Sequence, residues 1–130
     1  MATENLVDRV AFRDGMKPDD AYLFLATSGT LNGSDGINSF QNNSIARYTD
    51  LGEIWLYTNT KNFTGWAKSM VSISNGKPYR PFASCTLEAM ANLGDLSVVA
   101  SKDHGVDGTD WTRTIVHPRG HYFVVLDRIE

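Results

Sequence analysis

The sequence predicts an all-β fold, an antiparallel β-sandwich of roughly eight to ten strands joined mostly as hairpins and meanders. Apolar and polar residues alternate over short stretches, and turn signals recur roughly every eight to twelve residues. The 130 residues include eleven glycines and four prolines, which favours many turns and short strands. No repeat, linker or low-complexity tract is visible, so we expect a single domain over residues 1–130.

The strands follow one another along the chain. We expect residues 21–27 to be apolar enough for burial on both faces, and Asp50-Leu51-Gly52 to close a hairpin whose glycine takes a left-handed conformation. Residues 86–93 contain good helix formers, yet their neighbours need an antiparallel partner, which favours a strand. The expected strands are residues 6–13, 21–27, 44–49, 53–58, 69–74, 82–92, 96–102, 111–116 and 121–129.

Charge and composition exclude several classes of protein. The net charge is -3, and lysine and arginine are scattered, which predicts no nucleic-acid partner. No apolar stretch approaches the roughly 18 residues that cross a bilayer, so we expect no membrane partner. No signal peptide is visible, which predicts a cytoplasmic protein as written, or a fragment of a secreted enzyme. Cys85 is the single cysteine and is expected to be a buried, inert thiol.

Several stretches resemble the β-domain of heparinase II/III-like polysaccharide lyases. Residues 44–56 look like the first long hairpin of that domain, and residues 105–115 resemble a later segment that places an arginine on a core strand. The likeness continues through most of the chain in the family's order, at residues 10–15, 21–25 and 122–128.

The resemblance implies a fold and an activity. Members join an α/α-toroid to antiparallel sheets and cleave uronate-containing polysaccharides by β-elimination, with tyrosine and histidine as proton-transfer groups. This chain has no room for the toroid. Gln41 stands where the family has an aspartate, Ser39 where it has a histidine, and Thr58 near an expected zinc-binding aspartate. We therefore expect no catalytic residues, no metal site and no cofactor.

Positions that match the family scaffold remain, and we interpret them as structural, with arginine and aspartate paired on neighbouring strands and aromatic side chains packed on the sheet. These positions are Arg47, Tyr48, Trp55, Trp111, Arg113, Asp127 and Arg128.

Residues 28–43 form a long polar segment, either a functional loop or a mobile surface connection. Its amide side chains, with an exposed tryptophan, could bind a sugar, because sugars favour flat apolar faces beside planar polar groups. The predicted ligand-binding residues are Asn38, Gln41, Asn42, Asn43 and Trp66. Tyr79 and Trp111 are further candidates for stacking, although core packing explains a tryptophan equally well.

The histidines offer little chemistry in the sequence alone. His117 and His121 flank a turn, which predicts exposed histidines or, alternatively, a weak two-histidine metal site. His104 is expected in a solvated connection between strands.

Three functional hypotheses follow. The first is a non-catalytic, carbohydrate-associated β-domain whose partner is an acidic polysaccharide. The second is a structural subunit that forms a homo-oligomer or filament through edge strands. The third, which we favour least, is an active lyase using His104, Tyr122 and Arg119. The sequence thus leans against an enzyme.

Overall fold

The computed structural model describes residues 7, 9–27, 43–57, 85–104 and 108–130. The expected all-β, antiparallel architecture is confirmed: these residues form eight strands in two sheets of four, with no helix among them. The first sheet contains β1 (Arg9–Arg13), β2 (Tyr22–Ala26), β3 (Ser44–Asp50) and β4 (Glu53–Tyr57). The second contains β5 (Cys85–Leu93), β6 (Leu96–His104), β7 (Asp110–Pro118) and β8 (Val124–Ile129).

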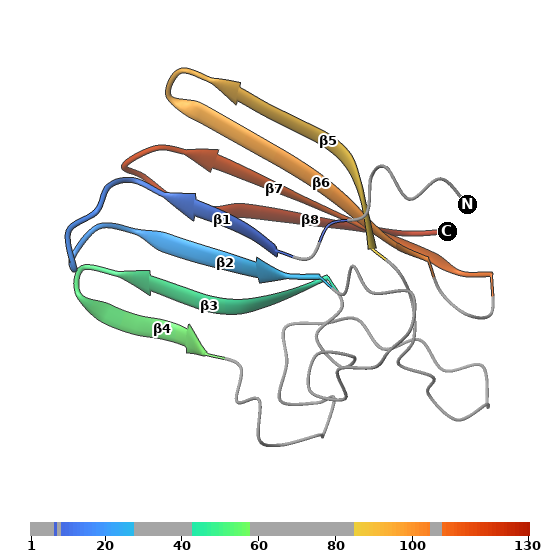
Figure 1. Ribbon diagram of the computed structural model, residues 1–130, viewed down its shortest axis with the longest axis horizontal. Helices are drawn as coiled ribbons and strands as arrows, with labels where there is room; N and C mark the ends of the chain where they lie inside the picture. Colours follow the sequence, from blue (N-terminus) through green and yellow to red (C-terminus); the bar gives the residue numbers. More distant parts are fainter. Residues whose placement is uncertain (1–6, 8, 28–42, 58–84, 105–107) are drawn as a thin grey trace.

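Each sheet is a meander, because its strands lie side by side in the order of the sequence (Figure 1). All neighbouring pairs are antiparallel. At residues 86–93 the strand forms as expected, because β6 supplies hydrogen-bonding partners along nearly all of β5. The strand expected at residues 69–74 lies outside the described residues.

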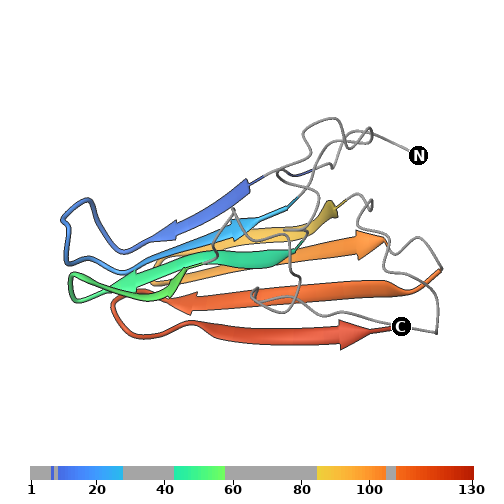
Figure 2. The same ribbon diagram turned by 90° about the horizontal axis from the view of Figure 1, so that it is seen from below.

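Buried side chains of both sheets belong to one core cluster. Figure 2 shows that the strands of the two sheets run roughly along one direction. Alternate side chains of each strand point inward, as the period of two requires. The first sheet contributes Phe12, Leu23, Leu25 and Ile45, and the second contributes Val99 and Ile115. Aromatic contacts extend this core toward the β7–β8 turn, where the Phe12 and Phe123 rings meet edge to face at 5.9 Å.

The β3–β4 turn needs two residues in the left-handed region. Leu51 has φ 54° and Gly52 has φ 77°, and the flanking Asp50 and Glu53 are paired. Two consecutive positive φ values define the tight turn whose twist matches an antiparallel hairpin. The left-handed glycine is therefore confirmed, whereas Leu51 holds a conformation that costs a side chain with a Cβ about 1–2 kcal/mol.

The expectation that residues 21–27 are buried on both faces is wrong for the first half of the segment. Leu23 and Leu25 are buried in the core, but Tyr22 and Phe24 lie half-exposed on the opposite face. β2 is thus covered on one side at these positions, which leaves two aromatic rings at the surface. None of the described segments forms a helix able to cross a membrane.

Candidate functional site

The outward side of the first sheet gathers aromatic and arginine side chains. Successive side chains of a strand point to opposite faces of the sheet, so the residues next to the core residues along each strand point away from the core. Two register rows cross the sheet on this side: one joins Ala11, Phe24, Arg47 and Tyr57, and the next joins Arg13, Tyr22, Thr49 and Ile54. We call this surface, together with Arg9 and Trp55, the aromatic–arginine face.

A β-bulge in β4 enlarges this face. Tyr48 pairs with Leu56 and Thr49 with Ile54, so that Trp55 is the extra residue. Tyr48 and Leu56 pack against the core, which directs both Ile54 and Trp55 outward instead of one inward. Ile54, Trp55 and Tyr57 are consequently 58%, 64% and 63% exposed.

The ring positions on this face are held by local contacts. The Trp55 indole Nε1–H donates to the Asp50 carbonyl oxygen at 3.1 Å. Tyr22 and Phe24 stack with an interplanar angle of 9°, and the Arg13 guanidinium lies 4.7 Å from the centre of the Tyr22 ring. A face ordered in this way loses little side-chain freedom when a flat ligand covers it.

The charge of this face is opposite to that of the whole chain. Its described strand residues include three arginines, Arg9, Arg13 and Arg47, all exposed, and no aspartate or glutamate. The nearby Asp50 is directed to the other side, where its Oδ2 accepts from the Tyr48 hydroxyl. In a protein of net charge -3, this surface is therefore a local cationic patch.

A second arrangement, buried, locks the two sheets together. Arg113 of β7 is 4% exposed, and its Nε and Nη2 donate to the two carboxylate oxygens of Asp127, both at 2.8 Å. Trp111 Nε1 donates to the same carboxylate at 2.9 Å. The remaining guanidinium nitrogen, Arg113 Nη1, donates to the Asn43 carbonyl oxygen at 2.9 Å. Asn43 directly precedes β3, in the other sheet.

Asn43 completes this lock with its side chain. It is fully buried with φ 54°, and its Nδ2 donates to the Trp111 carbonyl oxygen at 3.2 Å, while its Oδ1 accepts from the Ser101 hydroxyl. Asn43 thus bonds to two strands of the opposite sheet. Burial alone would raise the pKa of Asp127. The hydrogen bonds from Arg113 and Trp111 outweigh the effect of burial, so that the pKa of Asp127 lies below its ordinary value.

The expected pairing of arginine and aspartate on neighbouring strands is confirmed by Arg113 and Asp127. Trp111 is packed as expected, with the Arg113 guanidinium 4.7 Å from its ring centre, and it offers no open ring for stacking on a sugar. Trp55 departs from the structural interpretation, because its ring lies mainly in solvent. Cys85 is buried, as expected.

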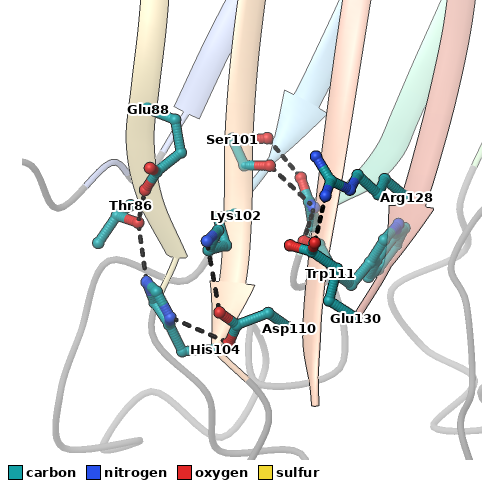
Figure 3. Close-up of polar contacts among 10 residues, drawn as sticks. Thr86, Glu88, Ser101, Lys102, His104, Asp110, Trp111, Arg128 and Glu130 are labelled. Atoms are coloured by element: carbon teal, nitrogen blue, oxygen red, sulfur yellow. Dashed lines mark hydrogen bonds and ion pairs between the residues drawn. The ribbon is translucent and has the colours of Figure 1, made fainter.

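A third arrangement lies at the far end of the second sheet and has the outline of a hydroxyl–histidine–carboxylate triad (Figure 3). The Thr86 hydroxyl is 2.9 Å from His104 Nε2, and His104 Nδ1 is 3.3 Å from Asp110 Oδ1. The Thr86 hydroxyl also donates its single proton to Glu88 at 2.6 Å. It can therefore only accept from Nε2, which then carries a proton.

The hydrogen-bond partners of Thr86 and His104 indicate what this cluster does. His104 thus faces the Thr86 hydroxyl through Nε2 and the Asp110 carboxylate through Nδ1. Asp110 is also 3.3 Å from Lys102 Nζ, so that its carboxylate contacts both Lys102 and His104. The Thr86 hydroxyl proton is directed at Glu88 and not at His104, and the contacts of the cluster join β5, β6 and β7.

Asp103 is an isolated carboxylate nearby. Burial raises its pKa to about 6, the neighbouring His104 partly offsets this, and its buried Oδ1 has no hydrogen-bond partner. The described residues contain no group of three or more histidine, cysteine, aspartate or glutamate side chains placed to hold a metal.

The expectation that His117 is an exposed turn histidine is wrong. The residue is 1% exposed, and its ring stacks on Phe123 at 4.1 Å between ring centres. Its Nε2 lies 2.8 Å from Asp14 Oδ1, at an ion-pair distance without hydrogen-bond geometry. The reason is the alternation of β7, which directs His117 to the same side as Ile115. Burial lowers the pKa of His117 more than Asp14 raises it. His121 is exposed, so the two histidines do not form a joint site.

Of the predicted ligand-binding residues, Asn38, Gln41, Asn42 and Trp66 lie outside the described residues, as does Tyr79. Asn43 lies in the buried lock, where its amide is engaged by protein groups. His104 is at the end of β6 and half-buried, not in a solvated connection.

Comparisons of the chain with protein-family models, with curated proteins and with solved structures gave no match.

The aromatic–arginine face was missed by sequence reasoning. Alternation within Tyr22–Ala26 was the available signal, since aromatic and leucine residues occupy opposite faces there. The bulge that turns Ile54 and Trp55 to the same side leaves no comparable trace in the sequence.

Proposed function

We propose that this chain is a non-catalytic β-sandwich module that binds acidic polysaccharide on the aromatic–arginine face. The observation that carries the proposal is the combination of exposed rings, Trp55 and Tyr57, with exposed arginines and no acidic strand residue on this one face. Aromatic rings provide flat apolar contacts for the C–H faces of sugars. Guanidinium groups pair with carboxylates or sulfates in a two-pronged geometry.

The dimensions of the face suit an extended chain. Trp55 and Tyr57 are two residues apart on one strand, and such positions are about 7 Å apart. Arg47 lies beside Tyr57 on the neighbouring strand, about 5 Å away across the sheet. A polymer lying across these strands would therefore contact rings and guanidinium groups in turn.

The likeness to the β-domain of heparinase II/III-like lyases supports the proposal as far as the scaffold. The matching positions Trp111, Arg113 and Asp127 form one hydrogen-bonded group on β7 and β8, and Arg113 joins this group to Asn43, next to the other sheet. We propose that the chain keeps this architecture without the elimination chemistry.

The local lyase alternative is disfavoured by distance. His104 pairs with Asp110 at one end of β6, whereas Leu96 at the other end pairs with Pro118, which precedes Arg119. Eight residues of strand separate these ends, about 27 Å. His104 therefore cannot act on the same sugar ring as Arg119 or Tyr122.

The test is a titration of tryptophan fluorescence with a uronate polymer and with a neutral polymer of similar length. We expect a spectral change with the acidic polymer alone, weakened by added salt because exposed charges are screened. Trp55→Phe should reduce the change and identify its source. Arg47→Ala should weaken binding about fivefold, which corresponds to about 1 kcal/mol.

Arg128→Ala is the matched control, since Arg128 is an exposed arginine on the other sheet that pairs with Glu130. Equal loss in the Arg47 and Arg128 variants, or no response to any acidic polymer, would refute the proposal. Ultraviolet absorbance of unsaturated products, followed in the same mixtures, should stay flat.

A further inference from the structure

The outward side of the second sheet is apolar over most of its length. Val99 and Ile115 are buried toward the first sheet, so their neighbours along β6 and β7 point outward. The middle register row on this side joins Ala91, Val98, Val116 and Val124 across all four strands. None of these four is buried.

The rows on either side of it differ in size. Toward the β5–β6 and β7–β8 turns, the row consists of Leu93, Leu96 and Pro118. The row on the other side of the middle row, farther from these turns, consists of Ala89, Ala100, Thr114 and Leu126. The three rows contain no charged side chain, and Leu93 and Leu126 are 66% and 57% exposed. We call this surface the aliphatic face.

We infer that the aliphatic face is a self-association surface on which a second copy of this chain docks, face to face. A two-fold axis that lies in the interface and crosses the strands at the middle row reverses the direction along each strand. It places Leu96 of one copy over Ala100 of the other, and Leu93 over Ala89. Large side chains thus meet small ones on both sides of the axis, as close sheet packing at about 10 Å requires.

The same two-fold axis also brings opposite charges together at the two ends of the aliphatic face. Lys102 follows Ala100 by two residues, and Asp95 directly precedes Leu96 at the opposite end of the face. The axis that superposes Leu96 on Ala100 therefore brings Lys102 of one copy toward Asp95 of the other. Lys102 pairs with Asp110 in its own chain at 3.3 Å and retains donors for a second carboxylate.

The size of the face sets the strength of the dimer. Four strands at about 4.8 Å and three rows at about 7 Å give a footprint of roughly 400 Å² for each copy. A stable interface buries about 800 Å² on each partner. The dimer is accordingly weak and reversible, with its population depending on protein concentration.

The test is sedimentation equilibrium of the full chain from micromolar to millimolar concentration. We expect a monomer–dimer equilibrium that Ala100→Glu and Leu93→Glu each weaken at least tenfold, because a charge would be buried in an apolar contact. Leu93 is largely exposed in the monomer, so we expect its variant to keep the fold, and circular dichroism should verify this. Met16→Glu is the matched control, since Met16 is an apolar residue 84% exposed outside both faces, and it should leave the equilibrium unchanged.

A charge exchange tests the geometry. Lys102→Glu and Asp95→Lys should each weaken the dimer, and the double variant should recover most of the loss. A chain that stays monomeric at millimolar concentration, or a dimer that neither glutamate variant weakens, would overturn the inference. Loss of association without recovery in the double variant would overturn the axis proposed here.

Discussion

Asp103→Asn should stabilise the protein above neutral pH and remove part of its pH dependence. Burial raises the pKa of Asp103 from its ordinary 3.8 to about 6, so the folded state binds a proton that the unfolded state has released between these values. The folded state must therefore hold a buried carboxylate at pH 8. The difference between the two pKa values corresponds to an upper bound of about 3 kcal/mol.

Asparagine keeps the shape of the side chain without the charge. We expect the variant to be about 1–3 kcal/mol more stable than the parent protein at pH 8, with the difference shrinking as pH falls through about 6 and vanishing near pH 4. Urea unfolding of both proteins at pH 4, 5, 6, 7 and 8 measures this. Because other titrating groups are common to both, the difference isolates Asp103.

A difference that stays constant across this pH range would refute the reasoning, because it would mean that ionisation of Asp103 contributes nothing. A variant less stable than the parent at pH 8 would show that the carboxylate is compensated in the folded protein.

Three further predictions concern stability. Leu51→Asn should raise the free energy of unfolding by about 0.5–1 kcal/mol, because asparagine tolerates the left-handed conformation at the β3–β4 turn, and a thermal melt measures it. Asp127→Ala should lower that free energy by about 3 kcal/mol in urea unfolding, since it leaves the buried Arg113 without its carboxylate, whereas a matched loss in the exposed Glu130→Ala would contradict this. The pKa of His117 is lowered in the folded protein, so the unfolded chain binds a proton at this residue at higher pH than the folded chain does, and the free energy of unfolding falls as pH drops below about 6.5. His117→Gln should make the free energy of unfolding depend less on pH in this range. An NMR titration of the His117 ring should place its pKa below 6.5.

The fold was predictable because its signals are local. The alternation in β7 and β8 and the Leu51-Gly52 turn each act over a few residues, and each produced the expected strand or turn. An arginine–aspartate pair on neighbouring strands was expected from the family resemblance, and Arg113 and Asp127 form such a pair.

The surfaces were less predictable because they depend on registers and on contacts between sheets. Trp55 is the extra residue of a β-bulge, and this bulge changes which side chains of β4 face solvent. The hydrophobic pattern of the sequence fits a regular strand equally well, so it does not reveal the bulge. His117 was expected at the surface because it flanks a turn, and its contact with Asp14, far away in sequence in the β1–β2 connection, could not be foreseen. Alternation identifies which residues share a face, but not which face another sheet will cover.

The lock of Asn43, Trp111, Arg113 and Asp127 has a consequence for how the protein folds. Within each sheet, consecutive strands pair, so both sheets can form from contacts close in sequence, whereas Arg113 and Asn43 are 70 residues apart. We therefore expect docking of the sheets to be the late step in folding, with these hydrogen bonds forming at that step. Weakening the lock should accelerate unfolding far more than it slows folding, so that the lifetime of the native state depends on one buried arginine.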